Sequence, residues 1–70
     1  KLALEKVLSE ITILRLTPKI SELAGKIKAY TNVTLSDAII AATALLKDLP
    51  LATLNVRDFE KIEGLKLFKP

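Results

Sequence analysis

The chain has 70 residues, enough for one small domain, and contains no cysteine and no histidine. Disulfides, zinc sites built from thiolate or imidazole ligands, and catalysis by serine–histidine or cysteine–histidine pairs are therefore excluded. The net charge of +3 permits nucleic-acid binding but does not demonstrate it, because the lysines are scattered rather than clustered. Metal chemistry on this chain would use oxygen ligands, which suit Mg²⁺ or Mn²⁺.

Half of the residues are hydrophobic, and the mean hydropathy is +0.35. The longest uncharged run, Ala38 to Leu46, is far shorter than the roughly 17–25 residues of a spanning helix. We therefore expect no membrane association, a cytoplasmic location, and a buried interface with another chain that covers the excess apolar surface. The absence of Cys, Met, His, Trp and Gln, with abundant Lys, Leu and Ile, is typical of a thermophilic source.

The first half of the chain predicts a helix, a strand and a second helix. Apolar residues recur at helical spacing from the first residues to about Ser9, so the chain begins as though inside a helix and we expect an N-terminal portion to be absent. The β-branched, alternating segment 11–16 predicts a strand. Thr17 and Pro18 fit an N-cap followed by proline at the first helical position, which predicts an amphipathic helix from Pro18 to about Thr31.

The next predicted helix is apolar all round and has no polar face. It is predicted to run from Ser36 to about Asp48 and to stop before Pro50. A helix without a polar face is expected to be buried on several sides. The segment 51–54 then predicts a short buried strand.

The last segment predicts a short helix and a final strand. Residues 55–64 indicate a loop and a short helix with Gly64 in the C-terminal capping position, and residues 65–68 indicate a strand. Strands that alternate with helices predict an α/β fold with a parallel sheet, here of about three strands with flanking helices. The sheet and its helices are expected to form part of a three-layer sandwich, in which a further element covers the remaining side of the sheet.

Three polar residues are predicted to meet at one edge of this sheet. Thr53, Asn55 and Asp58 lie at or just after the carboxyl end of the strand 51–54, where ligands of open α/β sheets bind. The preceding helix runs antiparallel to that strand, so its N-terminus, with Asp37, lies at the same edge. Carboxylates and an amide gathered there would suit a divalent cation.

Each of these residues also has a purely structural interpretation. Ser36 and Asp37 can cap the helix and complement its dipole. Asn55 can cap the short helix, with Asp58 three residues later in a capping-box arrangement. Thr53 is most simply a β-branched strand residue.

Three blocks together resemble the C-terminal half of a PIN domain, and more closely a VapC-type toxin of toxin–antitoxin pairs. They read S-D-A-I-I-A-A-T-A-L from Ser36, P-L-A-T-L-N-V-R-D-F from Pro50, and I-E-G-L-K-L from Ile62. The resemblance implies a Mg²⁺- or Mn²⁺-dependent ribonuclease whose acids hold one or two metal ions. It places Asp37 as the third acid of the family's cluster.

The same resemblance matches Asn55 to the fourth position of the cluster, with Asp58 close behind and with Thr53 and Ser36 in supporting positions. The family's first aspartate and its early glutamate have no counterpart here, because Glu5 and Glu10 come too late in the pattern. Mg²⁺ would then be held weakly, and the chain, 1–70, would be the C-terminal portion of the domain.

The partners implied are a second copy of the chain or a complementing N-terminal half, an antitoxin protein, and RNA as the substrate of the complete domain. The alternative is a truncated, non-catalytic remnant that serves as a protein-interaction or dimerisation module.

Overall fold

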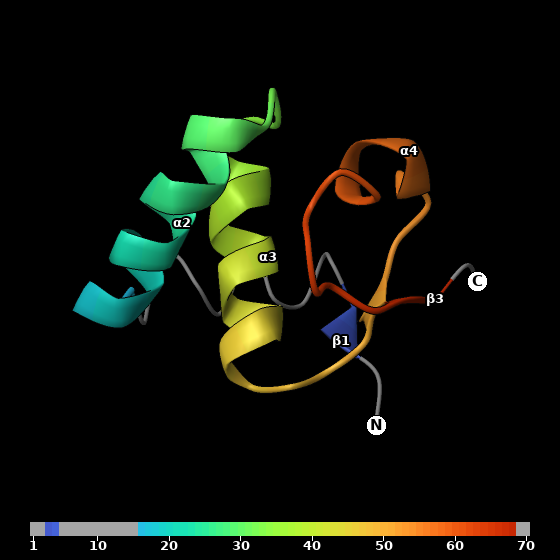
Figure 1. Cartoon of the computed structure of the whole chain (residues 1–70). Helices are drawn as coiled ribbons and strands as arrows, with labels where there is room; N and C mark the ends of the chain where they lie inside the picture. The colour runs from blue at the N-terminus through green and yellow to red at the C-terminus, as the bar shows by residue number, and fades with distance from the viewer. Residues whose placement is uncertain (1–2, 5–15, 69–70) are drawn as a thin grey trace.

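The computed structural model describes residues 3–4 and 16–68. Helices and short strands are mixed along this part of the chain (Figure 1). The elements are β1 (Ala3–Leu4), α2 (Pro18–Tyr30), α3 (Leu35–Leu46), β2 (Leu51–Ala52), α4 (Val56–Phe59) and β3 (Leu67–Phe68). The described strands form one parallel sheet in the order β1-β2-β3. The predicted α/β class, with a short parallel sheet and flanking helices, is confirmed.

The prediction of a helix at the start of the chain is wrong at Ala3–Leu4. These residues form β1, which pairs in parallel with β2 in the register Ala3 to Leu51. A central strand has unpaired backbone N–H and C=O groups on both edges, and β1 satisfies the edge that β3 leaves open. This pairing outweighs the local helical period. The rest of that predicted helix, and residues 11–15 of the predicted strand, lie outside the described residues.

Helix α2 confirms the prediction made from its capping sequence. The Thr17 hydroxyl oxygen accepts a hydrogen bond from the Ile20 N–H at 3.2 Å, and Pro18 is the first helical residue. Proline costs nothing there because its missing N–H would have had no partner inside the helix. The helix ends at Tyr30. Its buried face consists of Ile20, Ala24 and Ile27.

The N-cap of α3 is Thr34, and the prediction that Ser36 is the cap is wrong. The Thr34 backbone is extended (ψ 161°), and its hydroxyl oxygen accepts from the Asp37 N–H at 3.1 Å. An N-cap must be extended and stand three residues before the N–H that it satisfies. Ser36 is already inside the first turn, where it is exposed.

Replacement of Thr34 by alanine is expected to lower the free energy of unfolding by about 1 kcal/mol, because the Asp37 N–H loses its acceptor. Ser36→Ala is the matched control, and its effect should stay within about 0.5 kcal/mol because it removes an exposed hydroxyl from inside the helix. Urea unfolding followed by circular dichroism measures both. Equal destabilisation by the two variants would contradict the assignment of the cap.

Helix α3 ends earlier than predicted, and Pro50 does not cause the ending. The Asp48 N–H donates to the Leu45 carbonyl at 3.1 Å, and the Leu49 N–H donates to the Ala44 carbonyl at 3.0 Å. Asp48 has a positive φ of 52°. These features make a Schellman motif, which satisfies the last carbonyls of the helix and turns the chain towards β2.

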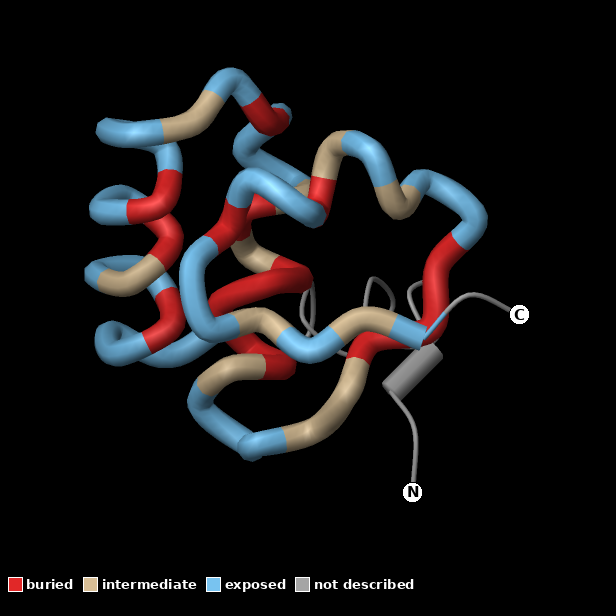
Figure 2. The backbone as a smooth tube through the Cα atoms, turned by 45° about the vertical axis from the view of Figure 1, so that its right-hand side comes forward, coloured by how far each residue is buried: buried red, intermediate tan, exposed pale blue. Residues whose placement is uncertain are grey.

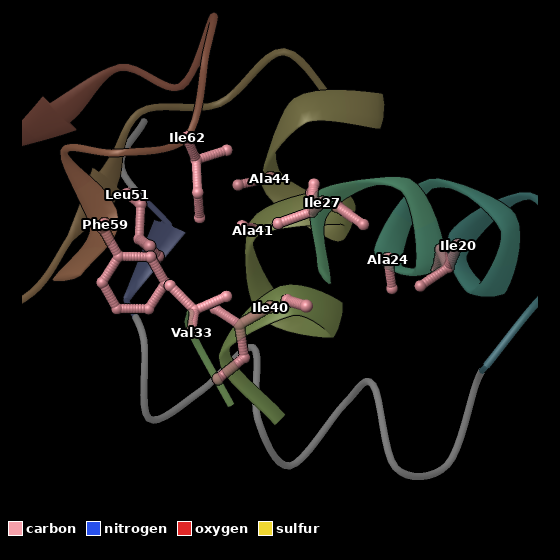
Figure 3. Close-up of a cluster of buried hydrophobic side chains, with 12 residues drawn as sticks. Ile20, Ala24, Ile27, Val33, Ile40, Ala41, Ala44, Leu51, Phe59 and Ile62 are labelled. Atoms are coloured by element: carbon pink, nitrogen blue, oxygen red, sulfur yellow. The ribbon is translucent and has the colours of Figure 1, made fainter. Parts of the chain in front are cut away.

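The core lies around α3 (Figure 2). The residues from Ile40 to Ala44 are all buried, as expected for a helix that is apolar all round. In Figure 3, Ile27 of α2 lies on one side of α3, and Leu51 of β2 and Phe59 of α4 lie on the other. Helix α3 is therefore packed between α2 and the sheet.

The C-terminal strands are shorter than predicted. Strand β2 covers Leu51–Ala52, and Leu54 beyond it is 89% exposed. Gly64 does not cap α4, which ends at Phe59; it stands third in the turn from Ile62 to Leu65 with φ 83°, a conformation that favours glycine. Within the part of the chain that the structure describes, no helix is long and apolar enough to cross a membrane.

Candidate functional site

The chain turns sharply at the carboxyl end of β2. Thr53 is buried at 3% exposure, and its hydroxyl oxygen accepts a hydrogen bond from the Asn55 N–H at 2.9 Å. Such a bond from a threonine side chain to the backbone two residues later stabilises a turn. Asn55 is thereby held at the rim of the sheet, directly before α4.

The side chains of Asn55 and Asp58 are joined by a hydrogen bond. The Asn55 amide Nδ2 donates to the Asp58 carboxylate Oδ2 at 2.8 Å. Asn55 occupies the N-cap position of α4, but its side chain does not bond an N–H of that helix. The side-chain capping expected in the structural interpretation is therefore wrong, because the amide is turned towards the carboxylate.

This pair has a donor set that suits a hard cation. A hydrogen bond to a charged acceptor is short and fixes the relative orientation of the two groups. The Oδ1 atoms of Asn55 and Asp58 remain as oxygen ligands of the type that Mg²⁺ prefers. Asn55 is exposed and Asp58 is half-buried, so an ion can reach the pair from solvent.

Asp37 lies at the same end of the molecule on a different element. It is the third residue of α3 and is half-buried. In Figure 1 the start of α3 and helix α4 lie at the same end, where β2 leads out of the sheet. Val33, just before α3, and Phe59 of α4 lie next to each other in the core (Figure 3).

The structure thus joins Thr53, Asn55 and Asp58 through hydrogen bonds and places Asp37 at the same end. Ser36 is exposed on the first turn of α3. Within residues 3–4 and 16–68, no three His, Cys, Asp or Glu side chains are grouped closely enough to hold a metal ion. The oxygen atoms of Asn55 and Asp58 are of the type that Mg²⁺ prefers, but the described residues alone do not supply enough ligands to hold the ion firmly.

Sequence reasoning missed two features of this edge. Thr34 caps the helix that carries Asp37, a role that the spacing T-L-S-D was enough to suggest. Leu54, directly before Asn55, was expected inside the strand 51–54, and only the short length of β2 reveals that its side chain is exposed.

Comparison with known proteins gives one match. The family model described as PIN domain matches residues 1–65. No curated protein and no solved structure matches the chain.

Proposed function

Because this chain belongs to the PIN-domain family, whose members are nuclease-type proteins that generally use divalent metal ions, we propose that it is the C-terminal portion of a VapC-type, Mg²⁺-dependent endoribonuclease. The observation that carries the proposal is the hydrogen-bonded Asn55–Asp58 pair at the carboxyl end of β2. Ligands of open α/β sheets bind at this edge.

In this proposal Asp37 is a direct or water-mediated metal ligand, and Asp58 and Asn55 are further ligands or position a water molecule. The 2.8 Å hydrogen bond between Asn55 and Asp58 presets the orientation of the carboxylate. Thr53 supports the pair by accepting from the Asn55 N–H. Ser36 stands beside Asp37 on the first turn of α3 and could bind a water of the ion's hydration shell.

A bound divalent ion would activate water and neutralise charge on the RNA phosphate. The chain's own contribution is to hold oxygen ligands at fixed positions before the substrate arrives. Two carboxylates and one amide leave Mg²⁺ mostly hydrated and weakly bound. The remaining acids of the cluster, an aspartate after a first strand and a glutamate on an early helix, would come from an N-terminal portion of the domain or from a partner.

We further propose an antitoxin protein and a second copy of the chain as partners, RNA as the substrate, and the cytoplasm as the location. The net charge of +3 favours association with a polyanion over repulsion from it. Among the residues whose burial the structure describes, six large hydrophobic side chains remain exposed, and protein partners would cover them. They are Leu16, Tyr30, Leu35, Leu46, Leu54 and Phe68.

The test is RNA cleavage by the complete domain, with this chain joined to its N-terminal portion. Cleavage of a single-stranded RNA is expected in Mg²⁺ or Mn²⁺ and should stop in EDTA. In parallel, Mg²⁺ titration of the 70-residue chain by NMR is expected to shift the amide signals of Asp37, Asn55 and Asp58 in the millimolar range, while the distant Lys47 serves as an internal control. Cleavage that persists in EDTA would contradict the metal-dependent mechanism.

The exposed hydrophobic residues also support a second function, that of a non-catalytic interaction module. Under this alternative, Mg²⁺ leaves the NMR spectrum unchanged and the complete domain cleaves no RNA, whereas a dimer of the chain is expected under both functions. Metal-dependent shifts at Asp37 and Asp58 would exclude it in favour of a residual metal site.

A further inference from the structure

Arg57 is an exposed cation next to the candidate metal ligands. It lies in α4 between Asn55 and Asp58, and it forms no ion pair with any acid of the described residues. We propose that Arg57 binds a phosphate of the RNA strand adjacent to the phosphate that reaches the Asn55–Asp58 pair. This inference rests on the proposed function, since it assigns the substrate contact of the same site.

The backbone of Arg57 is held in place by its neighbours. Phe59, two residues later, is completely buried in the core. The Glu60 N–H donates to the Val56 carbonyl at 2.8 Å across the single turn of α4. The Asn55–Asp58 hydrogen bond spans the same turn from the side-chain side. Arg57 therefore starts from a fixed point at the rim, and only its side chain has to be ordered by a ligand.

The Arg57 side chain points away from the Asp58 carboxylate because the two residues are consecutive in a helix. Consecutive residues of a helix point about 100° apart around its axis, and their Cα atoms are about 3.8 Å apart. Arg57 thus reaches solvent beside Asp58 instead of neutralising it, in agreement with the absence of an ion pair between these two described residues. A guanidinium in this position suits bidentate binding of a phosphate that follows the first one along the strand.

The surrounding charges do not oppose this role. Glu60 is exposed three residues later, and Lys61, also exposed, is four residues later. The chain keeps helical dihedral angles at Glu60, so Arg57 and Lys61 are expected on the same side. The positive charge of Lys61 offsets that of Glu60, and both are screened by solvent.

The test is the salt dependence of RNA binding. Binding of a fluorescein-labelled oligouridine to the chain is measured in EDTA by fluorescence anisotropy over a range of KCl concentrations. Each phosphate contact to single-stranded RNA adds about 0.7 to the slope of log affinity against log salt. Arg57→Ala is expected to reduce the slope by about 0.7, and Arg57→Lys is expected to retain it. Lys47→Ala, an exposed cation at the C-cap of α3 at the opposite end, should leave it unchanged.

The binding assay contains no divalent metal, so it tests the Arg57 contact independently of metal-dependent cleavage. Loss of RNA cleavage by the complete domain would overturn the nuclease proposal while the salt slope still reports the Arg57 contact. A slope unchanged by Arg57→Ala, or reduced equally by Lys47→Ala, would overturn the Arg57 contact. Failure of the wild-type chain to bind the RNA would also overturn the Arg57 contact. Circular dichroism of each variant confirms that the comparison is between folded chains.

Discussion

Replacement of Phe59 by alanine is expected to remove about 3–5 kcal/mol from the free energy of unfolding. Phe59 is completely buried, and it is the largest of the fully buried side chains among the described residues. It lies beside Val33 and Leu51, so that it joins α4 to the start of α3 and to the sheet (Figure 3). A 70-residue chain has little stability to spare. Most of its stability should therefore be lost, as measured by urea unfolding followed by circular dichroism.

Leu54→Ala is the matched control for this experiment. It removes a large apolar side chain from the same segment, but Leu54 is 89% exposed. Its effect should stay within about 0.5 kcal/mol. Comparable destabilisation by both substitutions would contradict the packing of α4 against α3, and with it the position of the Asn55–Asp58 pair. A Phe59→Leu variant, which keeps most of the buried volume, is expected to fall between the two.

Replacement of Asp37 by asparagine is expected to lower kcat/KM for Mg²⁺-dependent RNA cleavage by the complete domain about 100-fold or more. The substitution keeps the shape of the side chain but removes the charge that attracts the ion, and even indirect metal partners are worth about 10–100-fold. The helix should survive, because Thr34 caps it through the Asp37 backbone N–H, which asparagine retains. Loss of the favourable charge at the helix start costs about 0.3–1 kcal/mol.

The control for this prediction is Asp48→Asn. Asp48 is an exposed acid at the other end of α3, with its carboxylate 3.8 Å from the Lys66 ammonium. Exposed pairs of this kind contribute little to stability, so cleavage and stability should both be nearly unchanged. Undiminished cleavage by Asp37→Asn, measured alongside this control at the same Mg²⁺ concentration, would rule out the metal-binding role of Asp37.

The sequence predicted α2 and α3 well because their signals are local. The apolar period from Ile20 to Ile27 and the Thr17–Pro18 start are complete within one or two turns. The same holds for α3, whose lack of a polar face predicted burial on several sides. The alternation of helices and strands was sufficient for the α/β class. It also predicted that the polar residues after β2 and the start of α3 lie at one end of the molecule.

The backbone conformation was needed to decide which of two hydroxyl groups caps the start of α3. Thr34 and Ser36 both carry a side chain able to cap a helix, and only the extended dihedral angles of Thr34 decide between them. In the same way, Asn55 could either cap α4 or turn to Asp58. The turn fixed by Thr53 sets its backbone, and its amide bonds the carboxylate.

By itself, the sequence determined α2 and α3, the class of fold and the residue types available for chemistry, because these depend on neighbours a few positions apart. The tertiary structure decided the pairing of Ala3–Leu4 with β2 and the short extent of the strands, because backbone hydrogen bonds between distant segments outweigh local preference there. It also decided which of the polar groups at the sheet edge bond each other. The Asn55 amide bonds the Asp58 carboxylate at 2.8 Å, and Phe59, the residue after Asp58, is buried in a core built from distant segments, which no local pattern specifies.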